Sequence, residues 1–159
     1  MSDCYLVRYR EAIRRGEVVD GQKITAGREL IDELDRLIKD LENPRYIYDT
    51  SEAYERMDFM EQCIRLTKAP FYNKPMKLML WQKAFIETMY SFKMADSGFD
   101  RFKKILLLIA RKNTKSETCS ALALTEMILG EPGNDIVCSS NDDNQASIVY
   151  DAIDLMRIK

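Results

Sequence analysis

Apolar residues recur every three to four positions in long stretches of this chain, which is the period of an amphipathic α-helix. Polar residues fill the positions between them, so each such helix has a single apolar face that must pack on another element. The pattern predicts helices over residues 5–15, 25–41, 51–66, 78–95, 116–129 and 144–156. The expected capping segments are Thr25, 49–51 and 141–143.

Two shorter segments do not follow the helical period and are strand candidates. Residues 104–110 are nearly continuous in apolar side chains, which favours a strand buried on both faces of a parallel sheet. Residues 135–140, Asp-Ile-Val-Cys-Ser-Ser, are a second strand candidate. The order strand, helix, strand, helix indicates a βαβ unit with a right-handed crossover. Pro70 and Pro75 make the segment 69–77 an expected extended linker. The fold class predicted is α/β, with a helical region over 1–70 and an incomplete parallel-sheet domain over 71–159.

Composition narrows the function classes. Hydrophobic residues make up 46% of the chain and charged residues 31%, which is typical of a soluble globular protein. No apolar run is long enough to cross a bilayer, so we expect a cytoplasmic protein without a membrane partner. Because the sequence has no histidine, hydrolases that rely on a catalytic histidine are excluded. Its four cysteines are far apart and do not form the paired spacing of a zinc site.

The net charge of −2 does not predict a general electrostatic attraction to nucleic acid. Any contact with DNA would use local basic patches, and the candidates are 8–15 and 101–104. For both patches the interpretation as a solvated helix or turn surface is favoured.

The main chemical signal lies in residues 110–116, Ala-Arg-Lys-Asn-Thr-Lys-Ser, between the first expected strand and its helix. A polar loop that enters a helix at Lys-Ser is the setting of a phosphate-binding loop, where helix amides and a lysine bind the phosphates. The glycines of the full pattern are missing, because Ile109 and Thr114 occupy their positions. On pattern alone, a basic solvated loop is the favoured alternative.

The order of motifs around this loop resembles the large terminase subunits of tailed phages, which are DNA-packaging ATPases. In that family the loop usually reads Arg-Lys-Asn-Gly-Lys-Ser, and the first glycine is commonly absent. The matching elements here are Leu80-Trp81-Gln82, 99–102, 111–116, 130–133 and 143–146, together with the leading segments 9–21 and 46–49. The resemblance implies the first βαβα portion of a P-loop ATPase domain that binds ATP and Mg²⁺.

The resemblance also implies roles for individual residues. Lys115 and Ser116 would hold the phosphates and Mg²⁺, with Lys112, Asn113 and Thr114 completing the loop. Arg111 would act as an arginine finger, although a solvent-exposed loop arginine is an equal alternative. Trp81 and Gln82 would contact the adenine. Gln145 would sense the nucleotide state, and the plainer interpretation as a first-turn helix residue is slightly favoured.

Two features bear on activity. Thr114 stands where the family has glycine, and a β-branched residue resists the tight backbone turn, so ATP binding is in doubt. The acid pair needed for hydrolysis is also expected beyond residue 159, and Asp142 and Asp143 come too early to supply it. We therefore expect this chain alone to be inactive as an ATPase and as a nuclease.

The partners implied are double-stranded DNA, the terminase small subunit, the portal of the procapsid and further copies of the chain. Two alternatives stay open beside the motor function. One is a prophage remnant or fragment that serves only as a non-catalytic interaction module, and the other is an unrelated P-loop kinase or helicase.

Overall fold

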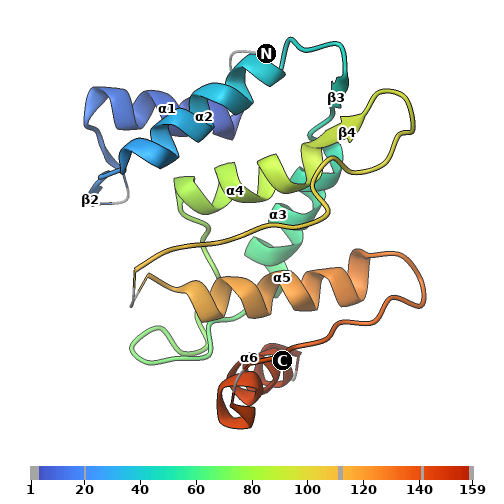
Figure 1. The fold of residues 1–159 in the computed structure, drawn as a ribbon. Helices are drawn as coiled ribbons and strands as arrows, with labels where there is room; N and C mark the ends of the chain where they lie inside the picture. The colour runs from blue at the N-terminus through green and yellow to red at the C-terminus, as the bar shows by residue number, and fades with distance from the viewer. Residues whose placement is uncertain (1–3, 20, 111–112, 141, 158–159) are drawn as a thin grey trace. The chain divides into compact units, whose positions relative to one another are not determined.

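A computed structural model describes residues 4–19, 21–110, 113–140 and 142–157 of the chain (Figure 1). The chain forms two compact units, each made of two separate segments of the sequence. One of the boundaries between these segments falls within a helix. Unit 1 comprises Met1–Glu55 and Leu78–Ile105, and unit 2 comprises Arg56–Lys77 and Leu106–Lys159. The expected domain boundary at residue 70 stays a prediction.

Among its described residues, unit 1 contains three helices, the start of a fourth and two small antiparallel sheets. Strands β1 and β2 pair with each other, and β3 pairs with β4 so that Tyr46 lies opposite Met94 and Tyr48 opposite Phe92. The elements in chain order are α1 (Tyr5–Arg15), β1 (Val18–Val19), β2 (Gln22–Lys23), α2 (Arg28–Asp40), β3 (Tyr46–Tyr48), the start of α3 (Ser51–Cys63), α4 (Leu80–Ser91) and β4 (Phe92–Met94).

The core of unit 1 is built around Phe92, which is fully buried at the junction of α4 and β4. Its ring makes edge contacts with Tyr48, Tyr46 and Phe102 at centroid distances of 4.8, 6.2 and 6.0 Å. Edge-to-face packing of aromatic rings adds stability beyond the area that they bury. The other buried members of this core are Cys4, Leu6, Leu34 and Leu37.

Most predicted helices of unit 1 are present, with corrected ends. The helix α1 has the expected bounds and ends at Gly16, which adopts φ 62° and closes the helix in the left-handed conformation. The helix α2 begins after Gly27, so Thr25 does not cap it. The helix α4 ends at Ser91 and does not reach residue 95, because the next three residues pair with β3.

Unit 2 contains the rest of α3, a loop over residues 64–77, α5 (Lys115–Leu129) and α6 (Asp143–Arg157). The helices α5 and α6 pack on each other, and the Ser120 hydroxyl donates to the Val149 carbonyl at 3.3 Å. Arg56 on α3 is 5% exposed, and its Nε pairs with Glu126 of α5 at 2.6 Å. A charge this buried needs such a partner. The helix α3 ends at Cys63 rather than Leu66, because the chain there enters the loop.

The two expected strands over 104–110 and 135–140 are not strands in the structure, where both segments lack regular secondary structure. A strand forms only against a hydrogen-bonding neighbour, and neither segment has one among the described residues. Several of their apolar side chains are exposed, with Leu106 at 87%, Leu108 at 88% and Val137 at 84%. The structure thus supports a helix-rich chain with small antiparallel sheets, and the parallel sheet stays a prediction.

The segment 69–77 is also different from the extended linker that its prolines predict. Residues 64–76 double back as a hairpin-like loop, in which Met76 donates to the Ile64 carbonyl and Leu66 donates to the Lys74 carbonyl, both at 2.9 Å. Asn73 adopts φ 63°, a conformation that asparagine tolerates better than most residues. Within the described ranges, no helix is long and apolar enough to span a membrane.

Candidate nucleotide-binding site

The polar loop enters α5 through Thr114, the residue directly before the helix. Thr114 has φ 55° and ψ 18°, and Lys115 is the first helical residue. The Thr114 carbonyl accepts hydrogen bonds from both the amide and the hydroxyl of Thr118, each at 2.9 Å. Thr118 is fully buried, so this pair of bonds fixes where the helix begins. A sharp left-handed turn therefore directly precedes α5.

The conformation of Thr114 is one that glycine favours and a β-branched residue resists. Left-handed backbone costs an L-residue roughly 1–2 kcal/mol, and the Thr114 hydroxyl offsets part of this by donating to the Asn113 carbonyl at 2.8 Å. The resemblance described above implies that related loops have glycine at this position. The structure supplies the physical reason for that preference.

Relief of this backbone strain is measurable as an increase in the free energy of unfolding. We expect Thr114→Gly to raise the free energy of unfolding by about 0.5–1 kcal/mol, because the relieved strain exceeds the extra chain entropy of glycine. Thr114→Asn should fall between the two, since asparagine tolerates the left-handed region. Urea denaturation followed by circular dichroism would test this order. A clear loss of stability in Thr114→Gly would contradict the strained turn.

The side chains that follow Thr114 are accessible to a ligand. Asn113 and Lys115 are exposed and Ser116 is half-buried, at the end of α5 where the first amides have no acceptor within the helix. Unpaired amides, an ammonium group and a hydroxyl together suit a polyphosphate. Arg111 and Lys112 lie outside the described residues.

A buried acid next to this end of α5 escaped the sequence analysis. Glu117 is 7% exposed, and its carboxylate accepts a 2.6 Å hydrogen bond from the Thr67 hydroxyl and a 3.4 Å bond from the Thr67 amide. These donors satisfy the carboxylate on the inner side of the helix, away from the exposed Lys115. The pairing could not be foreseen, because the two residues are 50 positions apart and neither belongs to a motif.

The Cys119 thiol lies on α5, one helical turn after Lys115. Burial raises its pKa, and the nearby Lys115 ammonium partly opposes that rise. Cys119 therefore stays a protonated thiol at neutral pH, which suits a packing role.

The expected adenine contacts lie in unit 1. Trp81 is half-buried on the first turn of α4, and Gln82 is 2% exposed. The Gln82 Oε1 accepts a 2.7 Å hydrogen bond from the Met79 amide, so this side chain caps the helix. A contact with adenine stays a prediction for both residues. Gln145 lies in α6, and its side chain is outside what the structure describes.

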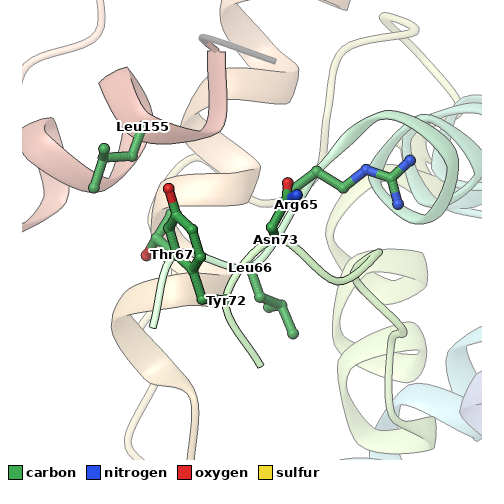
Figure 2. A pocket seen from close by; sticks show the side chains of 6 residues that line it. All are labelled: Arg65, Leu66, Thr67, Tyr72, Asn73 and Leu155. Carbon is green, nitrogen blue, oxygen red and sulfur yellow. The ribbon is translucent and has the colours of Figure 1, made fainter. Parts of the chain in front are cut away.

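Within the described ranges, no three cysteine or acidic side chains gather where they could hold a metal ion. A hollow in unit 2 is lined by Arg65, Leu66, Thr67, Tyr72, Asn73 and Leu155 (Figure 2). Its volume of about 10 Å³ suits one water molecule and excludes a nucleotide base.

Comparison with known proteins gives a family match that covers the loop. Residues 80–157 match the family model described as "Terminase large subunit, ATPase domain", which runs from α4 to α6 and includes the loop before α5. The curated proteins and the solved structures gave no match. The match over residues 80–157 supports the identification of this chain as a terminase large subunit.

Proposed function

We propose that this chain binds ATP at residues 110–116 and serves as the ATPase part of a motor that packages double-stranded DNA into viral procapsids. The observation that carries the proposal is the left-handed turn at Thr114 directly before a helix that opens with Lys115 and Ser116. That turn aims the helix amides at the loop, and the family match covers the same residues. The terminase small subunit, the portal and further copies of the chain are the partners that this motor would need.

Each group of the loop has a proposed task. The Lys115 ammonium would contact the outer phosphates, and the Ser116 hydroxyl would be the protein ligand of Mg²⁺. Mg²⁺ fits this position because most of its ligands are usually water molecules and phosphate oxygens, so that it needs few ligands from the protein. When bound, the ion would neutralise phosphate charge.

The other proposed contacts surround this centre. Arg111 would stabilise charge on the transferring phosphoryl group, and Lys112, Asn113 and Thr114 would line the phosphates with their backbone. Trp81 would pack on the adenine while Gln82 reads its edge, and Gln145 would respond to the nucleotide state.

A non-catalytic interaction module is the second candidate, and Thr114 favours it. The Cβ of a β-branched residue occupies space that a glycine leaves open for a phosphate. If this crowding blocks ATP, the loop is inert and the chain acts only through its surfaces.

A titration with a fluorescent ATP analogue and Mg²⁺ separates the two candidates. We expect Lys115→Ala to weaken binding by roughly 10- to 100-fold, because it removes a charge-assisted contact of about 1.5–3 kcal/mol. Thr114→Gly should tighten binding several-fold by opening the backbone to the phosphate. Lys103→Ala, which removes the same charge in unit 1, is the matched control and should bind like the parent.

The pattern of results decides the outcome. No binding by the parent with recovery in Thr114→Gly would identify the inert loop of the second candidate. Equal binding by the parent, Lys115→Ala and Thr114→Gly would mean that the loop is not the nucleotide site.

A further inference from the structure

The loop over residues 64–77, here named the basic loop, is an ordered projection of unit 2. Its base is fixed by Ile64 and Met76, which are 1% and 2% exposed and are joined by the hydrogen bond between them. Above the base, Arg65 and Pro75 form a bridge, and the Phe71 amide donates to the Lys68 carbonyl at 3.0 Å. A surface held in this way presents its side chains with little further cost in ordering.

The basic loop carries a charge that contrasts with the rest of the chain. It holds Arg65, Lys68, Lys74 and Lys77 and has no acidic residue, whereas the whole sequence has 24 basic against 26 acidic residues. The three lysines are exposed. Within the part of the chain that the structure describes, no carboxylate pairs with any of these four side chains. The positive charge is therefore available to an external anion.

Two aromatic rings are exposed among these lysines. Phe71 and Tyr72 are 55% and 54% exposed, and the Lys74 ammonium lies 5.4 Å from the centre of the Phe71 ring. Cations interleaved with exposed rings can hold phosphates while the rings contact sugars and bases. Such a surface fits a nucleic acid better than a simple anion.

The basic loop is also held against α5, within the same unit. Thr67 bonds to Glu117 in the first turn of α5, and Tyr72 faces Leu155 of α6 across the small hollow (Figure 2). These contacts connect the loop to the helix whose first residues are the candidate phosphate ligands.

We infer that the basic loop is a contact surface for the phosphate backbone of double-stranded DNA, with Lys68, Lys74 and Lys77 as the phosphate contacts and Phe71 and Tyr72 as apolar contacts. The inference rests on the proposed function for the identity of the polyanion, because a packaging motor must hold a duplex. Charge complementarity selects the partner, since the loop combines concentrated positive charge with exposed rings and has no acidic residue of its own.

The test measures anisotropy of a labelled DNA duplex at several salt concentrations without nucleotide. The triple variant Lys68→Ala/Lys74→Ala/Lys77→Ala should bind at least tenfold more weakly. Its plot of log affinity against log salt should be less steep by about 2–3, because each lost phosphate contact removes roughly 0.9 from the slope. The matched control is Lys23→Ala/Arg28→Ala/Lys39→Ala, which removes the same charge from exposed positions of unit 1 outside both candidate basic patches and should keep the parent affinity.

Additional binding measurements identify the ligand. Phe71→Ala/Tyr72→Ala should weaken binding of the duplex, and a larger loss on a single strand of equal length would instead assign the surface to unpaired bases. Competition by polyglutamate as strong as by DNA would point to an acidic protein partner and overturn the inference. Parent-like affinity in the triple lysine variant, or no DNA binding by the parent, would also overturn it.

Binding of the fluorescent ATP analogue by the same variants keeps the two proposals apart. DNA binding that depends on the basic loop, in a chain that does not bind the analogue, would refute the nucleotide site and leave this surface standing. Circular dichroism of each variant shows whether the fold is retained.

Discussion

Glu87→Ala is expected to lower the free energy of unfolding by about 3–5 kcal/mol, the largest effect of any single substitution proposed for this chain. Glu87 lies on α4 and is fully buried. Its carboxylate accepts hydrogen bonds from the Tyr5 amide at 3.0 Å, the Leu6 amide at 2.9 Å and the Tyr48 hydroxyl at 2.8 Å. The first two donors are the opening amides of α1, which have no partner within their own helix.

Removal of the carboxylate leaves these donors without their acceptor, and each buried unsatisfied group costs about 1–3 kcal/mol. The positive end of α1 also loses the negative charge that stabilises it. The side chains around the carboxylate respond to its charge. Burial, together with Glu87, raises the pKa of Tyr54 to about 12 and raises the pKa of Tyr48 well above its usual range.

Urea denaturation of the parent, Glu87→Ala and Glu87→Gln measures this effect. The glutamine variant should lose less than the alanine variant, because one acceptor oxygen remains. Glu55→Gln, at an exposed position, is the matched control and should change stability by less than about 0.5 kcal/mol. An alanine variant as stable as the parent would show that the carboxylate does not hold α1.

Arg101→Ala should have the second largest effect, a loss of about 2–4 kcal/mol. The guanidinium is 10% exposed, and its Nη2 pairs with Asp40 at 2.6 Å. It also lies 3.9 Å from the centre of the Tyr46 ring and about 5 Å from those of Phe92 and Phe102. Alanine would remove both the ion pair and the packing between these rings.

Arg101→Lys separates the two contributions, because lysine keeps the charge and loses the flat stacking surface. We expect it to recover part of the stability lost in the alanine variant. Arg45→Ala, an exposed arginine of the same unit, is the control. Equal stability in the lysine and parent proteins would mean that the rings contribute nothing beyond the charge.

The same ion pair gives a pH dependence with a defined sign. Burial alone would raise the pKa of Asp40, but the hydrogen bonds from Arg101 and Asn43 bring it below the usual 3.8. Between the lowered folded value and 3.8, the unfolded chain therefore binds more protons than the folded chain. The contribution of Asp40 is complete above pH 3.8 and is lost as the pH falls through the folded pKa. The stability of Arg101→Met should consequently fall less than that of the parent between pH 7 and pH 3.

Local signals were sufficient to place most helices. The 3.6-residue period in 5–15 and a glycine at position 16 define both ends of α1, because the helix face and the left-handed turn are encoded by neighbouring residues. The start of α5 was predicted within one residue for a similar reason. Helix ends that depend on tertiary contacts were less accurate, and α4 ends early because Phe92–Met94 pairs with Tyr46–Tyr48 far away in sequence.

Sheet pairing was the part that the sequence could not supply. An apolar run such as 104–110 has the composition of a buried strand, but a strand is completed only by a neighbour, and composition does not say which segment that is. For the candidate site, too, some features were evident from the sequence and others required the structure. The loop, its lysine and the departure at Thr114 were evident from a short motif. The bond between Thr67 and Glu117 and the capping role of Gln82 required the structure.

The carboxylate of Glu87 has a consequence for how unit 1 comes apart. A single side chain on α4 is bonded at once to α1 and to β3, so neither can detach without breaking the same cluster of hydrogen bonds. Partial opening is therefore penalised, and loss of order in this unit is cooperative. A protease would meet either the intact unit or a chain that is accessible along its length.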